Sequence, residues 1–220
     1  MMHKHWSILA IVLCSTIVLS GCWASVSPEE KVYRILEESV KKEHEFEEQH
    51  ERITQLEKEE KKIYKDIIEL GWRQSDSIRT LAEEALDNIG EREKFLAGEH
   101  KKIQASQKTS MKMENQIDKI EREEIKKQVI TLYKTMNKRY ETYEKLYEAY
   151  SQSLVYDREL YEMFTNENLK MDQLQEQIEK INKSYEKVLR YYEQFNELTE
   201  TFMQQKADFY RKNELENDQE

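Results

Sequence analysis

The chain has 220 residues, of which 36% are charged, and its formal net charge is −10 at pH 7. It contains only four glycines and one proline. Sheet proteins need such turn residues about every ten positions, so the composition excludes a predominantly β fold. The abundance of Glu, Lys, Gln and Leu favours long helices, and with this acidic balance we expect no nucleic-acid partner.

The chain begins with an apolar run, Trp6–Leu19, which is followed by small residues and a cysteine. The run is long enough for the hydrophobic part of a signal peptide and too short to span a bilayer. A plain secretory signal would also end in small residues, but it has no need of a cysteine at the cleavage point. The pattern is therefore typical of a bacterial lipoprotein signal, and its lipobox consists of Leu19, Ser20, Gly21 and Cys22.

This interpretation predicts that residues 1–21 are removed and that the sulfur of Cys22 carries a diacylglycerol with palmitate-type chains. Two acyl chains anchor a protein stably, whereas one chain gives only reversible membrane binding. Residues 22–27 would form a lipidated tether, and the protein would stand on the outer face of the cell membrane. Because Cys14 leaves with the signal, we expect no intramolecular disulfide in the mature chain, and no cofactor besides the lipid.

The first helix is predicted to begin at Ser27–Glu30, where Ser27 can cap the helix and Pro28 suits its first position. Apolar residues then recur at heptad spacing up to Leu70, and Gly71 is placed to end the helix. Four polar residues interrupt this seam: Ser39, Lys42, Gln49 and Glu60. These gaps fit either pairing with a partner chain or a long, solvated bundle.

A second helix is predicted to start near residues 74–76, and residues 104–116 then carry little apolar signal. Two arrangements stay open at this point. If 104–116 is a turn, the chain forms four helices of about 40–50 residues in an up-down antiparallel bundle. If it stays helical, the middle helix runs for about 90 residues, and the first and last helices lie along its two halves.

Apolar periodicity returns from Tyr133 to Phe164 and again from Leu174 to Phe209, which argues against disorder. We therefore expect an all-α protein, an elongated antiparallel helical bundle or coiled coil of three to four long helices. Residues 28–212 would form this single domain, and residues 213–220 a disordered tail.

Three segments in the second half of the chain carry a recognisable pattern: Asp157–Phe164 (DRELYEMF), Gln175–Asn182 (QEQIEKIN) and Ala207–Tyr210 (ADFY). Together with the lipobox and the charged helical body, they resemble the YkyA family of cell-wall-binding lipoproteins of Gram-positive bacilli. The resemblance implies a membrane-anchored, extracytoplasmic protein that binds the cell wall. It brings no catalytic residues with it.

Eleven of the 13 tyrosines lie between Tyr133 and Tyr210. Most of them share heptad positions, and Tyr185 and Tyr192 continue a similar seam, so we expect these rings to pack in the core of a thin bundle. Tyr156 and Tyr191 fall off the seams. They are the candidates for exposed rings that stack on wall sugars.

Residues 100–140 hold eleven Lys and Arg against five Asp and Glu, whereas the rest of the chain is acidic. The outer membrane face and teichoic acids are anionic, so an electrostatic contact with either would have to use this band. The candidate contacts with an anionic polymer are Lys101, Lys102, Lys108 and Lys112. The alternative is that the band neutralises acidic neighbouring helices.

Motifs for catalysis or metal binding are weak in this chain. Glu47–His50 contains one Glu-x-x-His motif, but a di-iron bundle needs a second. We therefore expect no enzyme activity and no metal. The leading hypothesis is a non-catalytic protein that binds peptidoglycan or teichoic acid. The alternative is a structural or adaptor coiled coil that binds another envelope protein or itself, with its oligomeric state open.

Overall fold

The computed structural model describes residues 26–44, 47–71, 75–166 and 169–215. The described residues form helices joined by turns, and no strand occurs among them, so the expected all-α class is confirmed. The helices are α1 (Pro28–His44), α2 (Glu47–Leu70), α3 (Ser75–Ser110), the 3-10 turn η1 (Met111–Met113), α4 (Glu114–Ile117), α5 (Glu123–Phe164) and α6 (Met171–Asn213). None of them is long and apolar enough to cross a membrane.

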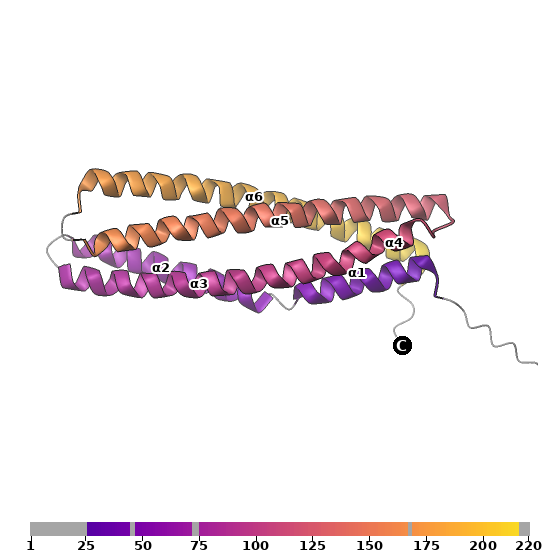
Figure 1. Ribbon diagram of the computed structural model, residues 1–220, viewed down its shortest axis with the longest axis horizontal. Coiled ribbons are helices and arrows are strands. Elements are labelled where there is room, and N and C mark those ends of the chain that lie inside the picture. Colours follow the sequence, from indigo (N-terminus) through magenta and orange to yellow (C-terminus); the bar gives the residue numbers. More distant parts are fainter. Residues whose placement is uncertain (1–25, 45–46, 72–74, 167–168, 216–220) are drawn as a thin grey trace, which may run out of the picture.

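The helices form an elongated rod in which α1 and α2 follow one another along α3, while α5 and α6 form an antiparallel pair (Figure 1). One end, here called the basal end, holds the start of α1, the turn before α5 and the end of α6. There Arg122 lies 3.7 Å from Glu29 and 3.4 Å from Asn213. The 42 residues of α5 make the rod roughly 63 Å long.

The chain reversal lies just beyond the segment in which the sequence left a turn open. Residues 104–117 are helical through α3, η1 and α4, and the reversal follows at residues 118–122. Its first bonds run from the amide of Lys119 to the carbonyl of Gln116 and from Ile120 to Ile117. The chain therefore matches neither alternative fully, because 104–116 is helical yet no 90-residue helix forms.

The predicted start and stop of the first helical segment agree with the structure. The amide of Glu30 donates a hydrogen bond of 3.1 Å to Oγ of Ser27, which caps α1. Gly71 follows α2 with a φ of 62°, the left-handed conformation that favours glycine. The structure describes this segment as α1 and α2, and residues 45–46 lie outside the described part.

Two apolar clusters hold the rod together. The basal core joins α1, α3, α5 and α6, and Leu36, Met136, Phe202 and Phe209 are among its buried side chains. The distal core is built chiefly by α2, α3 and α5. Between Leu174 and Phe202, no apolar side chain of α6 is fully buried. The packing of α6 is thus tight at the basal end and open in the distal half.

The four polar residues of the first seam all lie against groups of their own chain. The carbonyl of Ser39 accepts a hydrogen bond of 2.8 Å from Ser106. Lys42 donates to Thr109 at 2.5 Å, and Glu60 accepts from Tyr161. The side chain of Gln49 packs against Gly98, where a Cβ would come within 2.9 Å of it. Ser39, Lys42 and Glu60 therefore have hydrogen-bond partners within the chain, whereas Oε1 of Gln49 has none among the described residues.

A buried ion pair joins α1 to α5 where these polar residues meet. Both terminal nitrogens of Arg139 donate to the carboxylate of Glu43, at 3.0 and 2.7 Å. Tyr140 and Ser106 donate to the same carboxylate, and Nε of Arg139 donates to Thr199 of α6 at 2.7 Å. Arg139, one of the basic residues of 100–140, is thus internal and compensates a buried acid.

We expect Glu43→Leu to lower the free energy of unfolding by about 3–5 kcal/mol, because it leaves the Arg139 guanidinium buried without its counter-charge. The double variant Glu43→Leu/Arg139→Met should recover much of this loss, since it removes both charges. Urea unfolding followed by circular dichroism measures both values. A single variant within about 0.5 kcal/mol of wild type would contradict this role of the pair.

Candidate functional site

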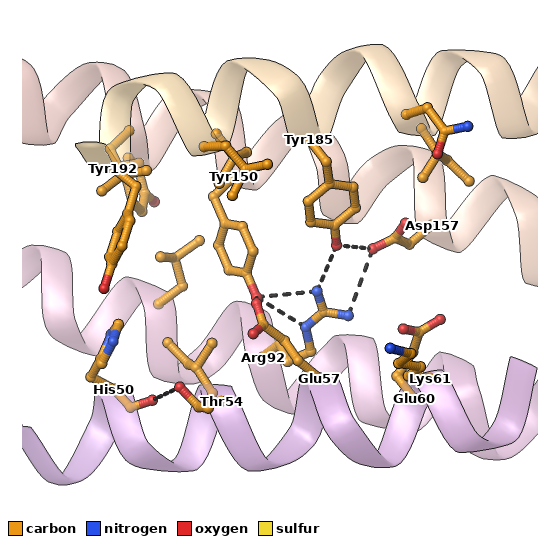
Figure 2. A pocket seen from close by; sticks show the side chains of 18 of the residues that line it. His50, Thr54, Glu57, Glu60, Lys61, Arg92, Tyr150, Asp157, Tyr185 and Tyr192 are labelled. Carbon is orange, nitrogen blue, oxygen red and sulfur yellow. Dashed lines mark hydrogen bonds and ion pairs between the residues drawn. The ribbon is translucent and has the colours of Figure 1, made fainter. Parts of the chain in front are cut away.

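An elongated groove with a volume of about 820 Å³ lies in the distal half of the rod. Its two walls are α2 and α6, and α3 and α5 form its floor (Figure 2). It extends from His50 to Tyr64 on α2, which is roughly 21 Å of helix. A site of this length can hold an extended ligand that lies along the rod axis.

The two walls of the groove differ in chemistry. The α2 wall is mainly polar and presents His50, Thr54, Glu57, Glu60, Lys61 and Tyr64. The α6 wall is mainly apolar and aromatic, with Ile178, Ile181, Tyr185, Val188, Leu189 and Tyr192. Leu189 and Tyr192 are 59% and 43% exposed. The groove is therefore amphipathic across its width.

A buried arginine forms the centre of the floor. Arg92 of α3 is 1% exposed. Its Nη2 donates to the hydroxyls of Tyr150 and Tyr185 at 3.1 and 2.8 Å, and Nε also donates to Tyr150, at 3.2 Å (Figure 2). Nη1 lies 3.6 Å from Oδ2 of Asp157 and makes no hydrogen bond within the described part of the chain. Nη1 is itself buried, so it is held beneath the groove beside the Asp157 carboxylate.

The tyrosines that surround Arg92 donate hydrogen bonds to carboxylates. Tyr185 donates to Asp157 at 2.7 Å, and Tyr150 donates to Glu57 of α2 at 2.6 Å. Burial raises the pKa of both hydroxyls above the usual range, so they remain donors. One network thus connects α2, α3, α5 and α6 beneath the groove.

Burial also raises the pKa of Asp157 to about 6, although the hydrogen bond from Tyr185 and the charge of Arg92 oppose this. Glu60 and Glu57 add to the rise. Their charges repel an ionised Asp157, which favours its neutral form. The protonation state of Asp157 at the groove floor therefore changes within the mildly acidic pH range.

A second polar cluster lies at the His50 end of the groove. The neighbouring carboxylate of Glu99 raises the pKa of His50, and Nδ1 lies 3.7 Å from Oε2 of that acid. Glu99 also accepts a hydrogen bond of 2.9 Å from Tyr143. Across the described residues, no group of three His, Cys, Asp or Glu side chains is arranged to hold a metal ion. The groove offers fixed donors and acceptors.

The predictions for the tyrosines are confirmed for some residues and wrong for others. Tyr140, Tyr143, Tyr150 and Tyr161 are buried, as expected for core packing. Tyr192 is exposed in the groove, so its assignment to a core seam was wrong: α6 stands away from α2 at that level. Tyr156 and Tyr191, expected to be exposed, are half-buried and line a second, smaller groove.

The structure distributes the candidate lysines along α3 and η1, outside the large groove. Lys101, Lys108 and Lys112 are exposed and Lys102 is half-buried. The hydrogen bond from Lys42 and, less strongly, the charge of Lys112 lower the pKa of Glu38, so Lys112 faces an acid of α1. Contact of these lysines with an anionic polymer stays a prediction. The lipobox, Leu19, Ser20, Gly21 and Cys22, lies outside the described residues.

The sequence reading missed Arg92 and Asp157. Both occupy helix positions at which the spacing predicts a buried apolar residue. Arg92 lies between Ile89 and Leu96, and Asp157 lies between Leu154 and Tyr161. A charged residue on a core seam is the signal that could have marked them.

Comparison with known proteins places this fold in a family. Residues 27–212 match the family model YkyA, described as "Putative cell-wall binding lipoprotein". A protein of Bacillus subtilis (strain 168), named "Uncharacterized lipoprotein YkyA", is 29% identical over 194 residues, which cover 88% of this chain and 86% of that protein. A crystal structure of a conserved protein of unknown function from Staphylococcus aureus has a TM-score of 0.69 at 15% identity, over 80% of this chain and 88% of that chain. At that identity the likeness shows the fold alone.

The raised pKa of Asp157 predicts a pH-dependent stability. Its folded value of about 6 exceeds the unfolded value of about 3.9, so its ionisation costs stability as pH rises between these two values. Relative to wild type, Asp157→Asn should therefore gain about 2–3 kcal/mol of unfolding free energy between pH 4 and pH 7. Urea titrations at both pH values measure the difference. A difference that is constant with pH, or that changes in the opposite direction, would contradict the shift.

Proposed function

We propose that this chain, which belongs to the YkyA family, is a non-catalytic lipoprotein that binds the peptidoglycan glycan of the cell wall in its distal groove. The observation that carries the proposal is the pairing of a wall rich in tyrosine and aliphatic side chains with a wall rich in carboxylates. A sugar ring likewise presents C–H groups on its faces and hydroxyl groups at its edges. The family description supports the choice of a wall polymer.

The charge of the groove favours a glycan over a polyanion. Its lining includes the carboxylates of Glu57, Glu60, Glu99 and Asp157 but only two permanently cationic side chains, Lys61 and Arg92. A chain of phosphates would be repelled by this balance. Hydroxyl and acetamido groups are instead suited to the hydrogen-bonding groups on the floor and the α2 wall.

The contacts of the carboxylates support binding rather than catalysis. Asp157 and Glu57 accept hydrogen bonds from Tyr185 and Tyr150, and Glu99 accepts one from Tyr143. These acids hold the tyrosine rings in place and fix the shape of the floor. Such a preformed site loses little conformational entropy when it binds a ligand.

A lipid on Cys22 would orient the rod with its basal end toward the membrane, because α1 starts there. Counted along α5 from Glu123, the groove residues Tyr143 to Leu160 stand roughly 30–55 Å from that end. Glycan binding at this height would take place away from the lipid headgroups.

The alternative is an adaptor coiled coil that binds another envelope protein or a second copy of the chain. The polar gaps of the first seam left partner pairing open, but Ser39, Lys42 and Glu60 have partners within the chain. The glycan hypothesis therefore accounts for more of the structure.

We expect Tyr192→Ala to weaken retention on peptidoglycan sacculi freed of teichoic acid by about tenfold, or ~1.4 kcal/mol, because the exposed ring contacts the sugar directly. Met203→Ala is the matched control, since Met203 is similarly exposed on α6 but lies outside the groove. Cosedimentation over a range of sacculus concentrations gives both affinities. Equal retention of wild type and both variants would overturn glycan binding here and favour the adaptor.

The anchor prediction is tested by Cys22→Ala. Without the thiol no diacylglycerol can be attached, so the protein should move from the membrane fraction into the medium or accumulate unprocessed. Cys14→Ala should stay membrane-bound, because that residue is expected to leave with the signal. Fractionation followed by mass spectrometry of the N-terminal peptide distinguishes these states. A lipid-free N-terminal peptide from the wild-type protein would refute the lipobox.

A further inference from the structure

We infer a second binding site, for a linear phosphodiester polymer, in a groove of about 440 Å³ on the other side of α6. It lies between α5 and α6, and we call it the lysine groove. Its lining includes Lys145, Tyr156, Lys180, Lys183, Lys187 and Tyr191. None of these residues lines the glycan groove, so this inference goes beyond the proposed function and stands on separate observations.

The lysine groove concentrates positive charge in the most acidic part of the chain. Residues 141–220 contain 19 Asp and Glu against ten Lys and Arg. Four of those ten line this one groove, and Glu148 is the only acid among its lining residues. Lys180 pairs with Glu176 at 3.1 Å, whereas Lys145, Lys183 and Lys187 make no ion pair within the described part of the chain. These three exposed ammonium groups can therefore bind an anion.

The lysines are arranged as a row along the helix axis. Lys180, Lys183 and Lys187 share one face of α6 and follow one another at rises of roughly 4.5 and 6 Å. Lys145 faces them from α5. An ammonium group is a compact point charge that binds phosphate well. A row of such groups suits a polymer with one charge per repeat better than a single small anion.

Packing between the two helices fixes the floor of the lysine groove. The buried hydroxyls of Ser153 and Ser184 hydrogen-bond at 2.7 Å, which brings α5 and α6 close together. Nε2 of Gln177 donates to the backbone carbonyl of Tyr156 at 2.7 Å. The guanidinium of Arg190 lies 5.1 Å from the ring centre of Tyr191 and adds a further cation at the rim. The site is thus preformed, with phenol groups available to the polyol units between phosphates.

The lysine triple variant Lys180→Glu/Lys183→Glu/Lys187→Glu tests the site, with de-acylated poly(glycerol phosphate) as the probe in isothermal titration calorimetry. We expect its Kd to rise by at least about tenfold, and the slope of log Kd against log salt, about 2–3 in the wild type, to fall. Lys101→Glu/Lys108→Glu/Lys112→Glu makes the same change of net charge at the candidate lysines of α3 and η1, which are the competing site. If the polymer binds in the lysine groove, this variant should raise Kd by less than about threefold.

Equal weakening by both triple variants would overturn the site and leave only a net-charge effect. Weakening by the α3 set alone would move the contact to the basic band of 100–140, and no weakening by either would also refute the proposal. Poly-glutamate with the same number of charges should bind less tightly than the phosphate polymer. Equal affinity would overturn the assignment to phosphate. Because the substituted lysines are exposed, we expect each variant to keep its fold. Its melting temperature verifies this.

Two sources carry this phosphodiester chemistry, a polymer linked to the wall and one anchored in the membrane by its own lipid. Sacculi that retain teichoic acid and vesicles that contain lipoteichoic acid probe them separately. Reduced binding of the lysine triple variant on either source supports the site, and on sacculi its binding should fall to the level seen on teichoic-acid-free sacculi. Unchanged binding on both sources refutes it. The variant should still bind teichoic-acid-free sacculi. Failure of the lysine-groove proposal is therefore distinguishable from failure of the glycan-groove proposal.

Discussion

The placement of Arg92 is the constraint on which the distal half of this protein depends. A guanidinium that is 1% exposed costs several kcal/mol of desolvation unless charges and hydrogen bonds compensate it. Here Tyr150, Tyr185 and Asp157 supply that compensation from α5 and α6, and Tyr150 extends it to Glu57 of α2. The helices must keep the separation that this network needs. An apolar residue at this position would let the walls approach, whereas the cation holds them around a groove.

The rod therefore combines two kinds of packing with two different tasks. At the basal end, Phe202 and Phe209 of α6 are buried beside Leu36 of α1, and the Arg139–Glu43 pair ties α1 to α5. In the distal half the network around Arg92 replaces such packing. There, one face of α6 lines a tyrosine-rich groove and another face of α6 carries a row of lysines. The basal half is thus packed throughout, whereas the distal half is open along both faces of α6.

The helices were predictable from sequence because their signals are local: Ser27 caps α1, and Gly71 takes the left-handed conformation after α2. The position of the reversal was not, because residues 104–116 look solvated while Ser106 and Thr109 are buried against α1. Their partners are distant in sequence and could not be paired in advance. For the same reason Tyr192 was assigned to the core. Arg92 and Asp157 were visible as charges at core spacings, but their joint network depends on the packing of four helices.

The proposed binding of glycan above Arg92 can be tested through the Nε–Hε resonance of that residue, which is shielded from solvent and hydrogen-bonded to Tyr150. Peptide-free glycan strands released from sacculi would be titrated into the labelled protein, with Arg139 as the internal reference. We expect the Arg92 signal to shift in a saturable manner while the Arg139 signal stays in place, because only Arg92 lies beneath the groove. Saturable shifts that spare Arg92, or no shift at any glycan concentration, would contradict a glycan site in the groove.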